Sequence, residues 1–405
     1  MTKLTWDNAA LIGPSTAREL GVWQGDVIAI EAAGQSIEAP VYVMPGQALD
    51  TIGLAMGYGR ETGSEEVVGK GVNAQRVRPP SGALMMAGAT VRKTGRTYEL
   101  ATTQNHFALD AMGREGIEQR RSDLVRETTL EAYKHDPEHA AGHKHKLFGL
   151  FSPHQYDGHR WAMAIDLSAC TGCTACVVAC QAENNVPVVG KTRIQRGREM
   201  HWIRIDRYFA GSDDAPAVVN APVTCMHCED APCEQVCPVA ATVHDSEGLN
   251  VMVYNRCVGT RYCSNNCPYK VRRFNFFNYR KKLTDLEALQ LNPEVTVRSR
   301  GVMEKCTFCT QRIETARIDA KVAGRALKDG DIVTACEQTC PTNAIVFGDL
   351  NDEKSRVRKL HDGHRAYPML EYLNVKPRVE YLVKVRNPLP ALAPAGSAAD
   401  HKEHA

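Results

Sequence analysis

The sequence lacks long apolar runs and a strong net charge. No stretch approaches the ~18 continuous apolar residues of a membrane-spanning helix, and the opening MTKLTWDN lacks the basic and apolar regions of a secretory signal. The 49 Lys and Arg residues nearly balance the 47 Asp and Glu residues, which leaves a formal net charge of +2. This balance excludes a strongly basic nucleic-acid binder. We therefore expect a soluble chain without a signal peptide.

Cysteine is absent from both ends of the sequence. All 15 cysteines lie between Cys170 and Cys340, and because their number is odd they cannot all pair as disulfides within the chain. At roughly 150 residues per domain, the chain length of 405 residues suggests two or three domains. The distribution of cysteine therefore predicts a cysteine-rich domain joined to modules of another kind.

Residues 1–105 have the pattern of a β-rich module. The apolar run 27–30 and the alternation of apolar residues over 37–43 predict strands separated by turns. A short helix is expected over 15–20, capped by its first residue, a serine, and ended by Gly21. The simplest interpretation of this module is a β-barrel.

Residues 106–160 are polar and rich in histidine, and we interpret them as a linker with a helix. Thr128 and Glu131 have the spacing of a capping box and predict the start of that helix. Imidazoles are potential metal ligands, but the Gly, Lys and Asp residues among them favour a solvated linker. These imidazoles belong to His135, His139, His143 and His145. Residues 351–405 are a C-terminal extension, and we expect its Pro- and Ala-rich tail to be disordered.

Residues 161–350 contain four cysteine motifs. The first has the spacing of the bacterial ferredoxin run, in which three thiolates hold one cluster and the fourth reaches another. The other three motifs each end in Cys-Pro. The motifs are Cys170-x2-Cys173-x2-Cys176-x3-Cys180, Cys225-x2-Cys228-x4-Cys233-x3-Cys237, Cys257-x5-Cys263-x3-Cys267 and Cys306-x2-Cys309-x26-Cys336-x3-Cys340.

This spacing suits iron–sulfur clusters. A two-residue gap lets a tight loop aim successive sulfurs at one cluster while its amide N–H groups point at the sulfides. The proline after the last cysteine prevents helix continuation. Residues 242–244 and 249–253 predict a hairpin between the second and third motifs. Together these features predict a duplicated ferredoxin architecture.

One thiolate is missing from the set. Four motifs of four would need sixteen cysteines, and alignment of the third motif on the first places Thr260 at the position of the second cysteine. A hydroxyl group has a high pKa and is a poor iron ligand. We therefore predict a three-iron cluster at that motif.

Three other uses of the cysteines are less consistent with the sequence. Zinc would use the CxxC pairs but leaves the x3-Cys-Pro tails and the fourfold repetition unexplained. Disulfides fit poorly to an odd number of cysteines in tight loops. Covalent haem requires CxxCH, and the sequence has no such pentapeptide.

Basic residues lie close to the motifs. Cationic neighbours would offset the negative charge of thiolate-bound clusters and raise their reduction potentials. For any one of them a solvated basic face is an equally good interpretation. They are Arg256, Arg261, Lys270, Arg272, Arg273, Arg300, Lys305 and Arg312.

The four motifs resemble those of the four-cluster electron-transfer subunits that partner molybdopterin oxidoreductases, including nitrate, polysulfide and dimethyl sulfoxide reductases. In that family the first motif interleaves with the fourth and the second with the third. The resemblance implies three 4Fe–4S clusters and one 3Fe–4S cluster. Its implied ligand sets are Cys170, Cys173, Cys176 and Cys340; Cys180, Cys306, Cys309 and Cys336; Cys225, Cys228, Cys233 and Cys267; and, for the three-iron cluster, Cys237, Cys257 and Cys263.

Residues 1–105 resemble the C-terminal, dinucleotide-binding barrel of molybdopterin oxidoreductases, through LTWDNAALIGPSTARELGVWQGDVIAIE and GLAMGYGR. With RKTGRTYELATTQNHFALD and LVRETTLEAYKHDPE, the whole arrangement resembles the iron–sulfur subunit of alternative complex III, a bacterial membrane assembly that oxidises quinol. The implied fold is α+β: a barrel of the molybdopterin-dinucleotide-binding type, without that cofactor, followed by a duplicated ferredoxin-like domain with long loops.

The same resemblance implies a non-catalytic subunit that relays single electrons. Its expected partners are quinol-binding integral membrane subunits, a multihaem cytochrome c and a chain carrying the rest of the molybdopterin-like domain. The expected location is the periplasmic face of a bacterial inner membrane, without nucleic acid and without molybdenum. Two alternatives stay open. One is the electron-transfer subunit of an active molybdopterin reductase, and the other is a zinc-binding interaction protein.

Overall fold

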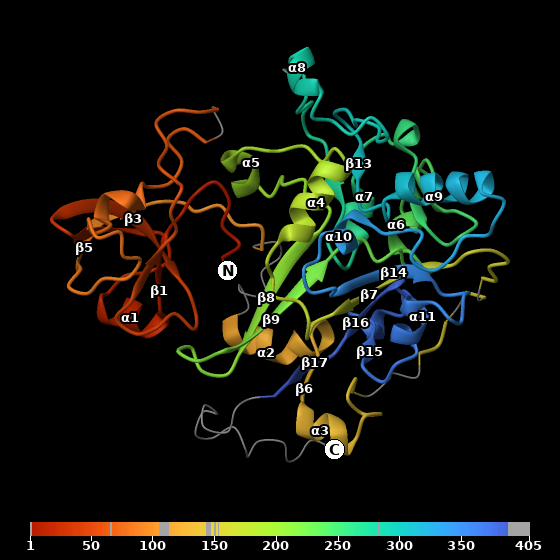
Figure 1. The fold of residues 1–405 in the computed structure, drawn as a ribbon, viewed down its shortest axis with the longest axis horizontal. Helices are drawn as coiled ribbons and strands as arrows, with labels where there is room; N and C mark the ends of the chain where they lie inside the picture. The colour runs from red at the N-terminus through yellow and green to blue at the C-terminus, as the bar shows by residue number, and fades with distance from the viewer. Residues whose placement is uncertain are drawn as a thin grey trace. The chain divides into compact units, whose positions relative to one another are not determined.

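The chain divides into two units (Figure 1). The computed structural model describes residues 2–64, 67–104, 113–142, 147–149, 151–152, 154–281 and 283–387, and of residues 113–118 only the backbone. The first unit comprises residues 1–107, 188–199 and 209–218. The second comprises residues 108–187, 200–208 and 219–405.

A five-stranded sheet with the order β4-β1-β3-β2-β5 forms the first unit (Figure 1). Its strands are β1 (Ala10–Ile12), β2 (Asp26–Ala32), β3 (Gln35–Val43), β4 (Ile52–Leu54) and β5 (Thr90–Thr97). In the antiparallel pair of β2 and β3, Ile28 lies opposite Ala39 and Ile30 opposite Ile37. These side chains are buried together with those of Ile12 and Val41. The strands predicted over 27–30 and 37–43 are confirmed.

The described strands form an open sheet, where the sequence predicted a barrel. Strands β4 and β5 are its two edges, and no pairing among the described residues joins them. Closure of a barrel requires the edge strands to pair, and β4 offers only three residues for such pairing. The alternation of apolar residues predicted the strands, but it contains no information about closure.

Helix α1 (Pro14–Glu19) follows β1, and the predicted helix is thus confirmed, but its predicted serine cap is wrong. Gly13 is the N-cap, and Pro14 opens the helix, because its fixed φ and missing N–H suit the first turn. Gly21 ends this segment with a φ of 62°. The first unit also contains η1 (Ala74–Val77) and α5 (Lys191–Gln195).

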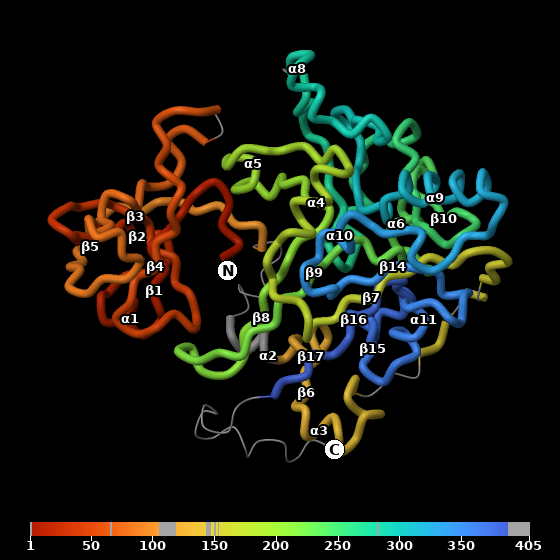
Figure 2. The backbone as a smooth tube through the Cα atoms, viewed as in Figure 1, coloured from red at the N-terminus to blue at the C-terminus, as the bar shows by residue number. Residues whose placement is uncertain are grey.

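The second unit contains a four-stranded sheet with the order β14-β7-β16-β15 (Figure 2). Its strands are β7 (Trp161–Asp166), β14 (Ile345–Asp349), β15 (Ala366–Tyr367) and β16 (Val379–Leu382). Helix α11 (Arg356–His361) covers this sheet, with Val357 buried against Ala162 and Ala164. The sheet therefore joins the segment before the first cysteine motif to the segment after the last.

The remaining described strands form four two-stranded sheets. They are β6 (Glu127–Thr129) with β17 (Lys384–Arg386), β8 (Arg204–Ala210) with β9 (Ala217–Val223), β10 (Thr242–His244) with β11 (Asn250–Met252), and β12 (Arg273–Phe274) with β13 (Met303–Glu304). The tip of the β8–β9 hairpin, residues 209–218, belongs to the first unit. The β10–β11 hairpin is the one that the sequence predicted between the second and third motifs.

Short helices carry five of the 15 cysteines, and loops carry most of the others. Its helices are α2 (Gly113–Leu124), α3 (Leu130–His135), α4 (Ala175–Glu183), α6 (Pro232–Gln235), η3 (Tyr254–Arg256), α7 (Tyr262–Asn266), α8 (Asp285–Ala288), α9 (Thr310–Val322), α10 (Ala335–Gln338) and η4 (Glu371–Leu373). Within the described ranges, no helix combines the length and the apolar character needed to cross a membrane.

The cap of the helix expected near Thr128 lies one residue later than predicted. Thr129 is the N-cap of α3, and its hydroxyl accepts a hydrogen bond of 3.1 Å from the backbone N–H of Ala132. Both threonines belong to β6, in which Thr128 pairs with Val385 and Thr129 with Arg386. Helix α3 therefore begins directly after a strand that pairs with a distant segment of the chain. The tail predicted to be disordered begins at Arg386, and this start is wrong, because Arg386 is the last residue of β17 and pairs with Thr129. From residue 388 onward the tail lies outside the described residues.

Candidate iron–sulfur sites

The loop of the first motif has an unusual backbone that places its cysteines. Gly172 has a φ of 71°, and Thr174 is in the left-handed region with a φ of 66°. Helix α4 begins directly afterwards and carries Cys176 and Cys180 on successive turns. A Cβ at Gly172 would lie 2.6 Å from Cγ of Asn220, so this position accepts only glycine without a shift of that side chain.

The third motif repeats this backbone. Gly259 has a φ of 77°, and Arg261 has a φ of 65° before the start of α7. Thr260 therefore occupies the loop position that Cys173 occupies in the first motif, as the sequence alignment predicted. The local conformation is kept although the thiol is replaced by a hydroxyl.

The second and fourth motifs also match each other. His227 has a φ of 44° and Phe308 a φ of 54°, each directly before the second cysteine of its CxxC pair. Their rings are stacked, with centroids 3.9 Å apart. The backbone N–H of Ala241 donates to Cys237 Sγ, and that of Ala344 to Cys340 Sγ, both at 3.2 Å. The duplication seen in the sequence is therefore present in the fold.

The structure brings the cysteines together in four groups. Burial, and after it the charges of the neighbouring thiolates in its group, raise the pKa of the Cys176 thiol to about 12. In each of the other three groups, burial and the charges of neighbouring thiolates likewise raise the pKa of a thiol. The first group is Cys170, Cys173, Cys176 and Cys340; the second is Cys180, Cys306, Cys309 and Cys336; the third is Cys225, Cys228, Cys233 and Cys267; and the fourth is Cys237, Cys257 and Cys263.

The donor set and its surroundings fit iron–sulfur clusters. Thiolates are the protein ligands of such clusters, and hydrogen bonds to their sulfurs stabilise the negative charge. Burial by itself would raise the pKa of Cys340, but backbone N–H groups near it, including that of Ala344, lower the pKa below 9.0. The thiols of the third group line one small cavity, and those of the fourth group line another together with Thr260.

Neighbouring groups interact in a linear order. Burial and the thiolates of its own group raise the pKa of Cys336, which belongs to the second group. The charge of Cys176, in the first group, raises this pKa further. Cys225 of the third group acts likewise on Cys306 of the second. The third and fourth groups are connected through Arg272, which affects Cys233 and Cys263. These interactions link the first group to the second, the second to the third and the third to the fourth.

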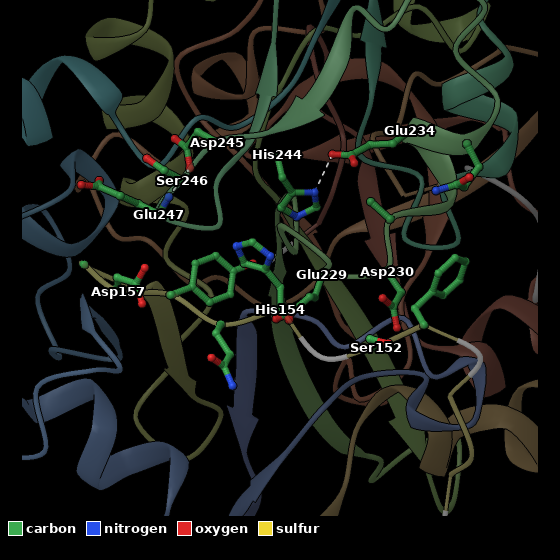
Figure 3. A pocket seen from close by; sticks show the side chains of 16 residues that line it. Ser152, His154, Asp157, Glu229, Asp230, Glu234, His244, Asp245, Ser246 and Glu247 are labelled. Atoms are coloured by element: carbon green, nitrogen blue, oxygen red, sulfur yellow. Dashed lines mark hydrogen bonds and ion pairs between the residues drawn. The ribbon is translucent and has the colours of Figure 1, made fainter.

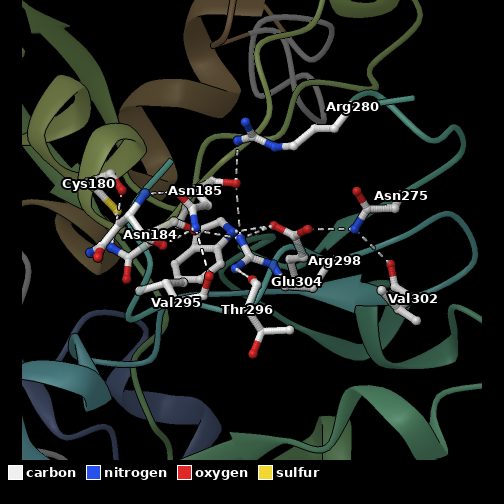
Figure 4. Close-up of polar contacts among 12 residues, drawn as sticks. Cys180, Asn184, Asn185, Asn275, Arg280, Val295, Thr296, Arg298, Val302 and Glu304 are labelled. Atoms are coloured by element: carbon white, nitrogen blue, oxygen red, sulfur yellow. Dashed lines mark hydrogen bonds and ion pairs between the residues drawn. The ribbon is translucent and has the colours of Figure 1, made fainter. Parts of the chain in front are cut away.

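Several buried polar residues that hold these motifs were not predicted from the sequence. Asn184 Nδ2 lies 3.6 Å from Cys180 Sγ and 3.9 Å from Cys309 Sγ, both in the second group. Arg298 forms a fully buried ion pair with Glu304 at 3.1 Å and donates to the Asn184 carbonyl oxygen at 2.6 Å (Figure 4). Residues 114 positions apart make these contacts, and no local pattern in the sequence signals them.

An open hollow of about 700 Å³ lies beside the third group, lined by residues of 151–158 and 229–247. His154, His244 and Glu234 face it, and His244 Nδ1 lies 2.8 Å from Glu234 Oε1 (Figure 3). Glu229, Asp230 and Glu247 also line it, and each is paired with a cation. The sequence predicted no functional site at this hollow.

The two linker histidines that the structure describes form no metal site. His135 and His139 are exposed, and His139 Nδ1 pairs with Asp136 at 2.7 Å, while His143 and His145 lie outside the described residues. Among the side chains that the structure describes, no three His, Cys, Asp or Glu residues are arranged to hold a single metal ion. A cluster differs from a single ion because its own iron and sulfide atoms occupy the space between the ligands.

Comparisons with known proteins agree with this donor set. Two family models, each described as a 4Fe-4S dicluster domain, match residues 169–241 and 217–286. The chain is 44% identical over 230 residues to the menaquinone reductase, iron-sulfur cluster-binding subunit, of Nitratidesulfovibrio vulgaris, a match that covers 55% of this chain and 88% of that protein.

Two further relatives match a region of similar extent. The Hdr-like menaquinol oxidoreductase iron-sulfur subunit 1 of Archaeoglobus fulgidus is 34% identical, over 55% of this chain and 82% of its own length. A tetrathionate reductase subunit of Salmonella typhimurium is 32% identical, over 57% of this chain and 77% of its own length. The chain therefore belongs to the family of iron–sulfur subunits, with 4Fe–4S dicluster domains, of quinone and molybdopterin oxidoreductases.

Proposed function

We propose that this chain is the electron-transfer subunit of a quinol-oxidising membrane complex of the alternative complex III type. The observation that carries the proposal is the arrangement of 15 cysteines in four groups that interact in linear order. Relatives named as menaquinone reductase and menaquinol oxidoreductase iron-sulfur subunits support the quinol side. The chain itself forms and breaks no bond of a substrate.

The four groups are the proposed ligand sets. The first, second and third groups each supply four thiolates for a 4Fe–4S cluster, and the fourth supplies three thiolates for a 3Fe–4S cluster. When bound, these clusters supply sites for single electrons. The protein's part is to hold the sulfurs, to donate hydrogen bonds to them, as Ala241 and Ala344 do, and to exclude water.

The three-iron assignment rests on Thr260. Its loop keeps the left-handed Arg261 and the positive φ of Gly259, so the backbone is the same as that of a four-thiolate motif. Thr260 lines the cavity of the fourth group, but the high pKa of a hydroxyl prevents it from replacing a thiolate at neutral pH. The fourth group therefore lacks one ligand, on a loop whose backbone is that of a four-thiolate motif.

The remaining parts of the proposal follow from the resemblance in the sequence. Residues 1–105 would be a module related to the molybdopterin-dinucleotide-binding domain, without cofactor, residues 106–160 a linker, and residues 161–350 the four-cluster domain. Its partners would be quinol-binding membrane subunits and a multihaem cytochrome c. The proposed location is the periplasmic face of a bacterial inner membrane.

The direct test of this function is reduction by quinol. The purified complex is mixed anaerobically with a menaquinol analogue, and the visible cluster absorbance and electron paramagnetic resonance (EPR) are followed. We expect the oxidised three-iron signal to disappear, with no molybdenum or tungsten in the preparation. A complex whose clusters quinol does not reduce would contradict the proposal.

A second candidate is the electron-transfer subunit of an active molybdopterin reductase. The match to the tetrathionate reductase subunit favours it, since 77% of that protein is covered. Stoichiometric molybdenum or tungsten, together with oxidation of the reduced clusters by a sulfur oxyanion such as tetrathionate, would support this function instead.

A further inference from the structure

Arg272 is a buried cation between two cysteine groups. It is only 5% exposed and follows the last cysteine of the third motif. Its Nη2 donates to Cys233 Sγ at 3.1 Å, to Thr242 Oγ1 at 2.6 Å and to Asn250 Oδ1 at 2.8 Å. The two oxygen acceptors belong to the β10–β11 hairpin, so this hairpin fixes the position of the guanidinium.

The same guanidinium acts on both neighbouring groups. On the side of the fourth group, its Nη2 donates to Thr242 Oγ1 and its Nη1 lies 3.9 Å from Met252 Sδ, and both of these residues line the cavity of that group. Its charge also opposes the effect of burial on the pKa of Cys263, a thiol of the fourth group. Cys233 belongs to the third group, and there too the charge of Arg272 is the largest effect that opposes burial, which raises the pKa of this thiol to about 11. The charge of one side chain therefore lies beside two different groups.

Arg272 has no carboxylate partner among the described residues. A buried guanidinium stays charged and must be compensated, because an isolated buried charge is costly. Burial alone would lower the pKa of Arg272, but the thiolate charges of Cys233, Cys263, Cys225 and Cys267 raise it above its usual value. Its counter-charges are therefore the sulfurs of the third and fourth groups.

Other cations near the motifs have different roles. Lys305 is fully buried and affects Cys233, but its Nζ donates to the backbone oxygen of Cys306, on the side of the second group. The guanidinium of Arg261 lies over the rings of Phe274 and Phe276, at 5.4 and 5.5 Å. Arg272 differs from both because its guanidinium donates a hydrogen bond directly to a cysteine sulfur.

We propose that Arg272 is a positioning residue whose single buried charge sets the reduction potentials of the third and fourth clusters together. This inference rests on the cluster assignment proposed above. Reduction adds one electron to a cluster, and a fixed positive charge beside its sulfurs stabilises that added negative charge. Removal of the charge must therefore lower both potentials, whereas loss of a mere structural contact would lower neither or only one.

The test is a potentiometric titration of all clusters by EPR in the purified complex, for the wild-type protein and Arg272→Gln. We expect the equilibrium constant for reduction to fall at least tenfold at both the three-iron cluster and the third cluster, which is about 59 mV for a one-electron couple. The first and second clusters should keep their potentials. Arg317→Gln is the control, because it removes the same charge from an arginine paired with Glu247 and Glu314.

Arg272→Lys keeps the protein testable if the glutamine variant does not assemble its clusters. Its ammonium retains a charge but lacks the planar fork of donors with which the guanidinium contacts Cys233, Thr242 and Asn250, so both potentials should fall together by a smaller factor. A shift confined to one cluster, or none, in a variant with the wild-type content of iron overturns the role of Arg272. A wild-type protein without iron instead overturns the cluster assignment itself, so the two failures are distinguishable.

Discussion

At the scale of single residues, Thr260 decides the type of one cluster. Replacement by cysteine would supply the missing thiolate on a backbone that already matches the first motif at Gly259 and Arg261. We expect the oxidised Thr260→Cys protein to lose the three-iron EPR signal and to gain iron at that site. Thr260→Ser is the control and should keep the signal. An unchanged three-iron signal in the cysteine variant would show that the ligand assignment is wrong.

The Arg298–Glu304 pair is a second feature whose loss has a defined consequence. Both side chains are 1% exposed, and Glu304 also accepts hydrogen bonds from Trp202 and Asn275. Arg298→Met leaves Glu304 buried without its cation, which costs about 3–5 kcal/mol.

The control for this variant is Arg325→Met, which breaks a solvent-exposed pair with Asp331 and should change the stability little, because water screens the pair. The measurement is the apparent Tm followed by cluster absorbance. The Tm of Arg298→Met should fall well below that of Arg325→Met. Equal Tm values would refute the claim that the buried Arg298–Glu304 pair stabilises the folded protein.

At the scale of secondary-structure elements, His159 and Asp349 join the segment before β7 to the end of β14. His159 Nδ1 lies 2.7 Å from Asp349 Oδ2, and this hydrogen bond raises the pKa of His159 above 6.5. The charged pair therefore stabilises the fold fully below about pH 6.5, and this contribution is lost as the pH rises through the raised pKa.

The stability of the wild-type protein should consequently decline relative to His159→Gln as the pH rises above about 6.5. The apparent Tm of both proteins, measured across this range, checks the difference. His364→Gln, at an exposed histidine, is the control and should follow the wild type. A constant difference between wild type and His159→Gln would contradict the coupling of the two strands by this pair.

Local patterns in the sequence predicted elements but not their long-range contacts. The strands at 27–30 and 37–43, the helix ending at Gly21 and the β10–β11 hairpin follow from apolar periodicity and turn residues. Closure of the first sheet depends on pairing between distant strands. The strand β6 just before α3 likewise exists only through its pairing with the distant β17. Local spacing carries no information about such pairing.

The site was predictable to a similar extent. Cysteine spacing predicted the motifs and the loop position of Thr260, because a tight loop around a cluster needs that spacing. The contacts of Asn184, Arg298 and Arg272 were not predictable as such, since each joins segments at least 20 residues apart.

At the scale of the whole molecule, the central claim is that one chain holds three 4Fe–4S clusters and one 3Fe–4S cluster. The most direct measurement is the iron and acid-labile sulfide content per chain, with EPR spectra of the same anaerobic sample in oxidised and reduced states. We predict iron and sulfide in the amounts of those four clusters, a three-iron signal when oxidised and interacting 4Fe–4S signals when reduced. An intact, pure protein without iron and labile sulfide would contradict the account.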